Sequence, residues 1–176
     1  SDVANAIIDG ADTIMLSAET ASGNYPVLTV KSMTRICQAV EKEADIYNKT
    51  TLDDIENTSD SVIASACELA DKVNAKAIIG LSQSGYSAFR IASHRPKASI
   101  YIATPNEQLM HQMNLVWGVR AFKFEKFTTT DESIEAVKKS LVASGLLKKG
   151  DIYVTTASMP MADIQLANSL KLGVVE

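Results

Sequence analysis

The stretch AIIGLSQSGYSAFRIASHRPKASIYIA, residues 77–103, decides the fold of this chain. It opens with an apolar run, Ala77–Leu81, passes through a serine-rich turn into an amphipathic segment at about residues 86–94, and closes with a second apolar run at residues 99–103. Short apolar runs on either side of a helical segment are typical of a strand–helix–strand unit, whose two strands pair in parallel. We therefore predict one such crossover here.

Strands and helices continue to alternate after this unit. Apolar runs predict further strands at residues 120–124, 152–155 and 170–175. Strands separated by helices at this spacing form a mostly parallel sheet, so the expected fold class is α/β, a three-layer α/β/α domain with five strands. The last connection, residues 158–168, is short for a crossover helix. The final strand is therefore expected to run antiparallel, at an edge of the sheet.

Capping signals indicate where the helices of this domain begin. Asp60 is expected to cap a helix whose apolar face carries Val62, Ile63, Ala66, Cys67, Ala70 and Val73. The run Thr104-Pro105-Asn106-Glu107 predicts a helix with a threonine cap. A second capping box, from Thr129 to Glu132, predicts a helix that ends at Gly145.

The beginning of the chain follows a different pattern. Residues 12–16, DTIML, are typical of one buried strand, and a polar loop follows at residues 17–25. Pro26 then begins a long helix whose apolar face carries Val27, Val30, Met33, Ile36, Cys37 and Val40. A lone strand cannot bury both faces, so this piece is expected to come from a larger β/α assembly. The first residue, a serine instead of a methionine, also suggests an excised fragment.

Composition and charge narrow the class of protein. The chain has 176 residues, 46% of them hydrophobic, with a mean hydropathy of +0.03 and a net charge of -4. These values are ordinary for a globular protein, and the negative charge argues against nucleic acid as a partner. The apolar runs are far shorter than a membrane span, so we expect no membrane partner and a cytoplasmic location. Cys37 and Cys67 lack metal-ligand spacing and are expected to be reduced core residues.

The serine-rich turn, LSQSGYS at residues 81–87, could be a nucleophile site, a phosphate cradle or only a polar turn. A nucleophile elbow needs G-x-S-x-G, and Ser84 stands where the second glycine belongs. A hydrolase also needs a histidine late in the chain, whereas the two histidines are His94 and His111. No G-x-x-x-x-G-K-[ST] run occurs, which excludes a Walker loop.

An anion site remains chemically reasonable at this turn. The first amides of the following helix are unpaired and point toward the turn, with the positive end of the helix dipole behind them. Ser82, Ser84 and Ser87 add hydroxyl donors, and Gly85 lets a ligand approach the backbone. Together these groups suit an anion of phosphate size.

Simpler interpretations of the same residues stay open. Ser84 can act only as the cap of the helix. Arg90 and Arg95 either assist an anion or pair with nearby acids, as surface arginines commonly do. The residue pattern by itself favours neither the anion site nor the cap.

A family resemblance begins in the first 26 residues, SDVANAIIDGADTIMLSAETASGNYP. They resemble the closing strand and loop of the catalytic barrel of pyruvate kinases, whose pattern is close to SDVANAVLDGxDxxMLSGETAxGxYP. The similarity continues along the chain in VKSMTRIC, in the S-G-x-S-A run, in HRP and in KKGD, at residues 30–37, 84–88, 94–96 and 148–151. It implies that residues 1–45 are the last strand and helix of a (β/α)8 barrel, 46–59 a linker and 60–176 the effector-binding domain.

The resemblance also implies catalytic roles in a parent enzyme. Ser17 matches the serine of the relay that protonates enolpyruvate, and Glu19 is expected to orient its loop. Ala18 stands where the family usually has glycine. The bare sequence allows a simpler alternative, in which residues 17–20 only hydrogen-bond a tight loop.

The parent enzyme would transfer phosphate from phosphoenolpyruvate to ADP, giving pyruvate and ATP. Its Mg and K ions would be held by residues upstream of this chain, so the chain itself is expected to bind no metal. Because phosphoryl transfer needs that metal and a positioned cation, the fragment alone is expected to be inactive.

By the same resemblance, the phosphate of an effector is expected at the serine-rich turn, on Ser82, Ser84, Gly85 and Ser87. Gln83 stands where some members have lysine. Residues 158–163, SMPMAD, replace a glycine-rich loop of bisphosphate-regulated members and add the carboxylate of Asp163. Since a carboxylate repels a second phosphate, we expect a sugar monophosphate, a nucleotide monophosphate or no effector, instead of a bisphosphate.

Two other classes of protein remain open, a stand-alone sensor of phosphorylated ligands and a structural interaction module whose serine turn is empty. The first 25 residues favour the enzyme, because a binding module has no need of a barrel strand that carries Ser17 and Glu19. The last strand, as an unpaired edge, predicts pairing with a second copy, so we expect a homo-oligomer.

Overall fold

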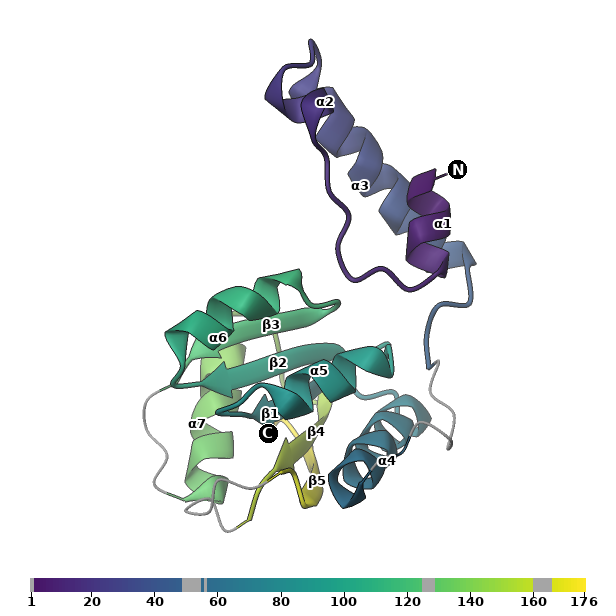
Figure 1. The fold of residues 1–176 in the computed structure, drawn as a ribbon. Coiled ribbons are helices and arrows are strands. Elements are labelled where there is room, and N and C mark those ends of the chain that lie inside the picture. The colour runs from purple at the N-terminus through teal and green to yellow at the C-terminus, as the bar shows by residue number, and fades with distance from the viewer. Residues whose placement is uncertain (1, 49–54, 56, 125–128, 160–165) are drawn as a thin grey trace. The chain divides into compact units, whose positions relative to one another are not determined.

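The computed structural model describes residues 2–48, 55, 57–124, 129–159 and 166–176. The chain forms two compact units, Ser1–Ile46 and Tyr47–Glu176 (Figure 1). The second unit contains the sheet and the serine-rich turn, whereas the first contains three helices.

One five-stranded sheet organises the second unit. Its strands are β1 (Ala77–Leu81), β2 (Ser99–Thr104), β3 (Val119–Lys123), β4 (Ile152–Ala157) and β5 (Ser169–Val174), in the order β3-β2-β1-β4-β5. The first four are parallel, and β5 pairs with β4 in the antiparallel direction. The predicted α/β class, the five strands and the antiparallel last strand are confirmed.

Helices cover both faces of this sheet, as Figure 1 shows. One core forms where α4 (Thr58–Lys72), α5 (Tyr86–Ser93), α6 (Glu107–Gln112) and the short 3-10 helix η2 (Met113–Leu115) pack on residues such as Ile78 and Val154. The other core joins α7 (Thr130–Ala143) to Ala77 and Ile79. Alternate residues of β1 therefore enter opposite cores, as the pleat of a strand requires, and the three layers are confirmed.

Two of the predicted helix caps are wrong. Asn57, and not Asp60, caps α4, because the Asn57 side chain accepts a hydrogen bond from the Asp60 amide at 3.1 Å. Asn106, and not Thr104, caps α6 in the same way, through the Leu109 amide at 3.1 Å. In both cases asparagine competes equally well for the cap, and the backbone path decides which residue lies there.

The cap predicted for α7 is confirmed. The Thr129 hydroxyl accepts from the Glu132 amide at 3.2 Å, as in a capping box. At the other end of the helix, Gly145 has a φ of 69° and its amide donates to the Val142 carbonyl at 2.9 Å. A glycine in this left-handed conformation ends the helix at the predicted place.

The first unit contains α1 (Asp2–Ile8), α2 (Ala18–Ala21) and α3 (Pro26–Glu43). Pro26 begins α3 as predicted. The strand predicted at residues 12–16 is wrong, because these residues join α1 to α2 without forming a strand, and Met15 is 83% exposed. A strand needs a neighbouring strand for its amides and carbonyls, and the described part of this unit provides none. The apolar face of α3 likewise lacks enough neighbouring elements to pack on, and no residue of α3 is buried.

Neither cysteine forms a disulfide, so both are free, as predicted. Cys67 is a buried core residue of α4, and burial raises the pKa of its thiol to about 12. Cys37, on α3, is only half-buried. The predicted core position is therefore confirmed for Cys67 and wrong for Cys37. The two thiols therefore differ strongly in their access to solvent.

Gly173→Ala tests how β5 is seated on the sheet. Gly173 pairs with Tyr153 of β4, and the Tyr153 ring covers its α-carbon so closely that an added methyl group overlaps the ring. The variant is expected to lose about 1–3 kcal/mol of unfolding free energy in urea denaturation, as overpacked sites do. The same substitution in a Tyr153→Ala background serves as the control and is expected to cost much less. An equal loss in both backgrounds contradicts this account.

Candidate functional site

The serine-rich turn lies at the carboxyl end of the central strand β1, where α5 begins. From β1 the chain crosses through α5 on one face to β2, whereas β4 is reached through α7 on the opposite face. The crossovers therefore diverge between β1 and β4. In open α/β sheets, ligands bind outside the carboxyl ends of the strands at such a switch point.

Two serine hydroxyls already bind the amides of this turn. The Gly85 amide donates to Ser82 Oγ at 2.9 Å, and the Tyr86 amide approaches Ser84 Oγ at 3.4 Å. Ser82 and Ser87 are buried, whereas Ser84 is exposed. A hydroxyl that accepts one hydrogen bond still has its own proton to donate, so the turn retains donors for an anion. Gly85, and not Ser84, is the cap residue of α5, and the helix has no side-chain capping hydrogen bond, so the simpler interpretation of Ser84 as the cap is wrong.

Gly85 holds the turn in a shape that no other residue adopts easily. Its φ of 87° is left-handed, and a Cβ there would lie 2.6 Å from Leu109 Cδ1 and 2.9 Å from Met113 Cε. Side chains of α6 and η2 therefore cover the α-carbon of Gly85. A ligand has to approach the turn from the side of its amides and hydroxyls.

A buried ion pair fixes the first turns of α5 to the start of α4. The Asp60 carboxylate is fully buried and accepts from Tyr86 Oη at 2.7 Å and from Arg90 Nε at 3.0 Å. Arg90 Nη2 reaches the second oxygen of the same carboxylate at 3.0 Å, so the pair is bidentate. The hydrogen bond to Asp60 also raises the pKa of Tyr86.

This network assigns Arg90 and Asp60 roles that the sequence pattern did not reveal. Of the two possibilities for Arg90, the structure shows pairing with an acid. Asp60 was expected at the helix cap, where its carboxylate would have accepted a hydrogen bond from an amide of its own helix. The sequence carries no signal for this role, because Asp60 stands among the polar residues Thr58, Ser59 and Ser61 at the start of the helix.

Arg95 lies beyond the opposite end of α5 from the serine turn. It is 6% exposed, and its guanidinium carbon lies 4.8 Å from the centre of the Trp117 ring. This contact is a cation–π interaction. The structure therefore does not bring Arg95 to the candidate anion site.

Ser17 and Glu19 belong to the first unit, separate from the serine turn. The Ser17 amide donates to Glu19 Oε2 at 3.0 Å, and Thr20 Oγ1 donates to the Ser17 carbonyl at 3.2 Å. Backbone hydrogen bonds, from Glu19 itself and from Ser17, lower the pKa of the Glu19 carboxyl. These are the contacts of a tight loop, and all three residues keep their side chains at least partly in solvent.

Of the segment expected to approach a second phosphate, residues 158–163, the structure describes only Ser158 and Met159. Met159 is joined to Asn168, because Asn168 Oδ1 accepts from the Met159 amide at 2.8 Å and Asn168 Nδ2 donates to the Met159 carbonyl at 2.6 Å. Residues 160–163, including Asp163, lie outside the described residues.

Over the ranges that the structure describes, no group of three or more His, Cys, Asp or Glu side chains could hold a metal ion. Those ranges also contain no helix long and apolar enough to cross a membrane.

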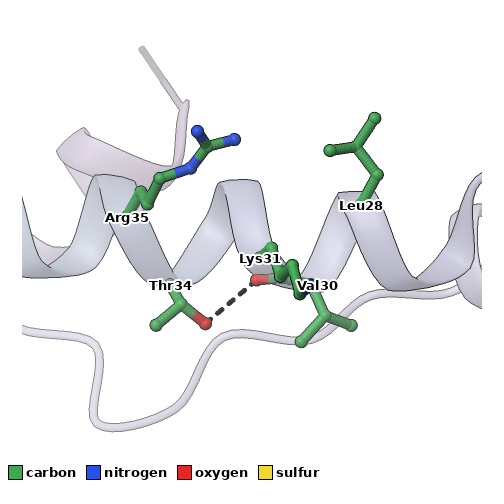
Figure 2. Close-up of a pocket in the computed structure, with 5 residues that line it drawn as sticks. All are labelled: Leu28, Val30, Lys31, Thr34 and Arg35. Atoms are coloured by element: carbon green, nitrogen blue, oxygen red, sulfur yellow. Dashed lines mark hydrogen bonds between the residues drawn. The ribbon is translucent and has the colours of Figure 1, made fainter.

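A shallow apolar concavity of about 410 Å³ runs along α3 (Figure 2). Leu28, Val30, Lys31, Thr34 and Arg35 line it, and Thr34 Oγ1 donates to the Val30 carbonyl at 2.9 Å. A second concavity of about 390 Å³ continues it toward the start of the helix, from Asn24 to Leu28 and Lys31. The lining residues of the two concavities include no carboxylate and no histidine.

Comparisons with known proteins agree with this architecture. The second unit matches the family model "Pyruvate kinase, alpha/beta domain" over residues 60–172, and the first matches "Pyruvate kinase, barrel domain" over residues 1–30. The chain is 38% identical to the pyruvate kinase of Clostridium acetobutylicum over 180 residues, covering 100% of this chain and 38% of that protein. It is also 38% identical to the enzyme of Geobacillus stearothermophilus, covering 99% of this chain and 30% of that protein.

Solved structures show the same similarity. A crystal structure of pyruvate kinase from Cryptosporidium parvum superposes with a TM-score of 0.86 at 26% identity, covering 99% of this chain and 35% of that one. A second crystal structure of the C. parvum enzyme gives a TM-score of 0.83 at the same identity.

The fold of the second unit is that of an α/β domain attached to a phosphotransferase barrel. The chain belongs to the pyruvate kinase family. It spans about a third of the length of the relatives that it matches.

Arg90→Met tests the buried ion pair beside the serine turn. The variant leaves the Asp60 carboxylate buried without its cation, and the unfolding free energy in urea is expected to fall by about 3–5 kcal/mol. The double variant Asp60→Asn/Arg90→Met is expected to recover most of that loss. Glu68→Gln, which breaks an exposed pair with Lys72 in the same helix, is the control and should cost about 1 kcal/mol or less. A loss for Arg90→Met no larger than that of the control would falsify the role of the pair.

Proposed function

We propose that this chain is the C-terminal region of a pyruvate kinase that transfers phosphate from phosphoenolpyruvate to ADP, giving pyruvate and ATP. The observation that carries the proposal is family similarity along the whole chain, through both the barrel model and the α/β model. The first unit would complete the catalytic barrel, and the second would bind an effector and contribute contacts between subunits.

In such an enzyme the chain supplies only auxiliary catalytic groups. Ser17 would belong to the proton relay to enolpyruvate, and Glu19 would hold its loop through the hydrogen bond to the Ser17 amide. The Mg and K ions and the cation that neutralises the transferred phosphate would be bound by the remainder of the barrel. The chain on its own is therefore proposed to lack phosphoryl-transfer activity.

The serine turn is proposed to bind the phosphate of an effector. Its position at the switch point of the sheet supports this, as do the hydroxyls of Ser82, Ser84 and Ser87, which keep their own protons to donate. Arg90 is paired with Asp60 and Gln83 is neutral, so the described residues of the turn add no free cation from these positions. A weakly cationic site suits one phosphate better than two, which favours a sugar monophosphate or a nucleotide monophosphate.

The exposed apolar surface of α3 is proposed to pack against other βα units of the barrel. Val27 is 65% exposed and Leu28 is 54% exposed, although both lie at apolar positions of the helix. The same surface contains the concavities of Figure 2. Two features differ from the expected barrel pattern: residues 12–16 form no strand, and the apolar face of α3 is exposed. Neighbouring βα units would pair with residues 12–16 and bury this face, so both differences would disappear.

The edge strand β5 is proposed to join two copies of the chain into a homo-oligomer. Leu170, Leu172 and Val174 project from one face of β5 and are 38%, 46% and 53% exposed. An apolar edge strand with unpaired backbone groups is an unusual feature for a surface that stays in water. A second copy related by two-fold symmetry would cover it.

The anion site can be tested with the chain as it stands. Titration with inorganic phosphate, AMP, glucose 6-phosphate and fructose 1,6-bisphosphate, followed by calorimetry and amide NMR shifts, is expected to show binding of the monophosphates at residues 82–87. Ser84→Ala should weaken that binding by about tenfold, since one hydrogen bond to a charged group is lost. Ser93→Ala, which removes a hydroxyl at the far end of α5, should leave it unchanged.

Two results would contradict this assignment. Micromolar binding of fructose 1,6-bisphosphate that Ser84→Ala abolishes would rule out the preference for a monophosphate. If no anion shifts the amides of residues 82–87, the turn is empty and the domain serves only structural contacts.

Leu172→Glu tests the subunit contact. Sedimentation velocity of the wild-type chain is expected to show a concentration-dependent oligomer, which the variant converts to monomer because a carboxylate enters the apolar contact. Lys171→Gln, on the opposite face of the same strand, should leave the oligomer intact. A wild-type chain that stays monomeric at high concentration would show that β5 is not the contact.

A further inference from the structure

Residues 17–23 form a tight loop in the first unit, built around the backbone of Ser17. The Ser17 carbonyl accepts from the amides of Thr20 and Ala21, at 3.2 Å and 3.0 Å, and from Thr20 Oγ1 at 3.2 Å. The Ser17 amide donates to Glu19 Oε2 at 3.0 Å. Both backbone groups of Ser17 are therefore held by other residues of the loop.

The Ser17 hydroxyl does not cap the helix that follows it. Ser17 is the N-cap residue of α2, yet it makes no side-chain capping hydrogen bond. A cap serine usually has an extended backbone, from which its oxygen accepts from an amide of the first turn. Ser17 has a φ of -116° and a ψ of -107°, which is not extended. Glu19 supplies only the other half of a capping box, the bond from the cap amide to a carboxylate.

Gly23 closes the loop against the backbone of Glu19. The Gly23 amide donates to the Ala18 carbonyl at 2.9 Å. A Cβ on Gly23 would lie 2.5 Å from the Glu19 carbonyl oxygen and 3.0 Å from the carbonyl carbon. These are backbone atoms, which cannot turn aside as the end of a long side chain can. A larger residue at position 23 therefore displaces the backbone of the loop.

We propose that Thr20 and Gly23 are positioning residues, which fix the backbone of Ser17 and Glu19 so that the Ser17 hydroxyl stays out of the helix cap and can serve the proton relay. This inference rests on the proposed function of Ser17 in the parent enzyme. Thr20 acts through the Ser17 carbonyl, and Gly23 acts through the backbone of Glu19. The lowered pKa of the Glu19 carboxyl agrees with this arrangement, because backbone hydrogen bonds of Glu19 and Ser17 cause it.

An NMR titration of the Glu19 carboxyl carbon tests the role of Gly23. In the wild-type chain we expect a pKa below the ordinary value of a glutamate, and a Ser17 amide shift that follows the same titration. Gly23→Ala is expected to raise that pKa toward the ordinary value, because a displaced backbone loses the hydrogen bonds that favour the carboxylate. Ser22→Ala removes a long hydrogen bond of 3.4 Å next to Gly23. It serves as the control and should leave the pKa unchanged.

Amide exchange of Ser17 tests the role of Thr20. Thr20→Val keeps the branched shape but cannot donate to the Ser17 carbonyl, so the Ser17 amide is expected to exchange about fivefold faster, as the loss of one hydrogen bond implies. Thr20→Ser keeps the donor and is expected to retain the wild-type rate. Thr34→Val removes the equivalent hydrogen bond in α3, from Thr34 Oγ1 to the Val30 carbonyl, and should not change the exchange of Ser17.

A raised Glu19 pKa in Gly23→Ala, together with faster Ser17 exchange in Thr20→Val, supports the inference. A Ser17 amide that does not follow Glu19 in the wild type overturns it, and so does a Gly23→Ala or Thr20→Val variant that behaves as the wild type. If Gly23→Ala loses the amide signals of α3, the Thr20 variants decide alone. Neither readout involves phosphoenolpyruvate, so a failure here is distinct from a failure of the proposed function.

Discussion

Strand β1 lies in the middle of the sheet, paired in parallel with β2 on one side and β4 on the other, and the rest of the second unit depends on this placement. Ala77, Ile78 and Ile79 are all fully buried, with alternate side chains in opposite cores. A strand buried on both faces has to be apolar along its length, and its polar continuation has to emerge at an end. The serine turn is that continuation, at the point where the crossover helices part to opposite faces.

The serine turn is braced from two directions. From α4, the buried Asp60 carboxylate holds Tyr86 and Arg90 in the first turns of α5. From α6 and η2, Leu109 and Met113 close over the α-carbon of Gly85. Because both contacts are in the interior, the amides and hydroxyls of the turn are positioned before any ligand arrives. This preorganisation would reduce the entropy cost of binding an anion there.

Much of this architecture could be predicted because it depends on local patterns. The five strands were found from their apolar runs, and the antiparallel last strand from the short connection before it. The prediction failed where two local signals competed. Asn57 and Asp60 are both good caps, and only the path of the chain into α4 shows that Asn57 has that role. The sequence predicts a candidate site on Ser82, Ser84, Gly85 and Ser87, but it does not predict the contacts of that turn with Asp60 and Leu109.

The sequence by itself determined the α/β class, the order of the elements and the family, because periodicity and motifs are properties of neighbouring residues. Tertiary structure decided which groups meet across long separations, such as Asp60 with Arg90 and Tyr47 with Trp117. It also decided that residues 12–16, although apolar enough for a strand, do not form one here. The long-range contacts and the missing strand have the same physical reason. A strand needs hydrogen-bond partners for its backbone, and a buried charge needs a partner of opposite charge, and folding brings these partners from distant parts of the sequence.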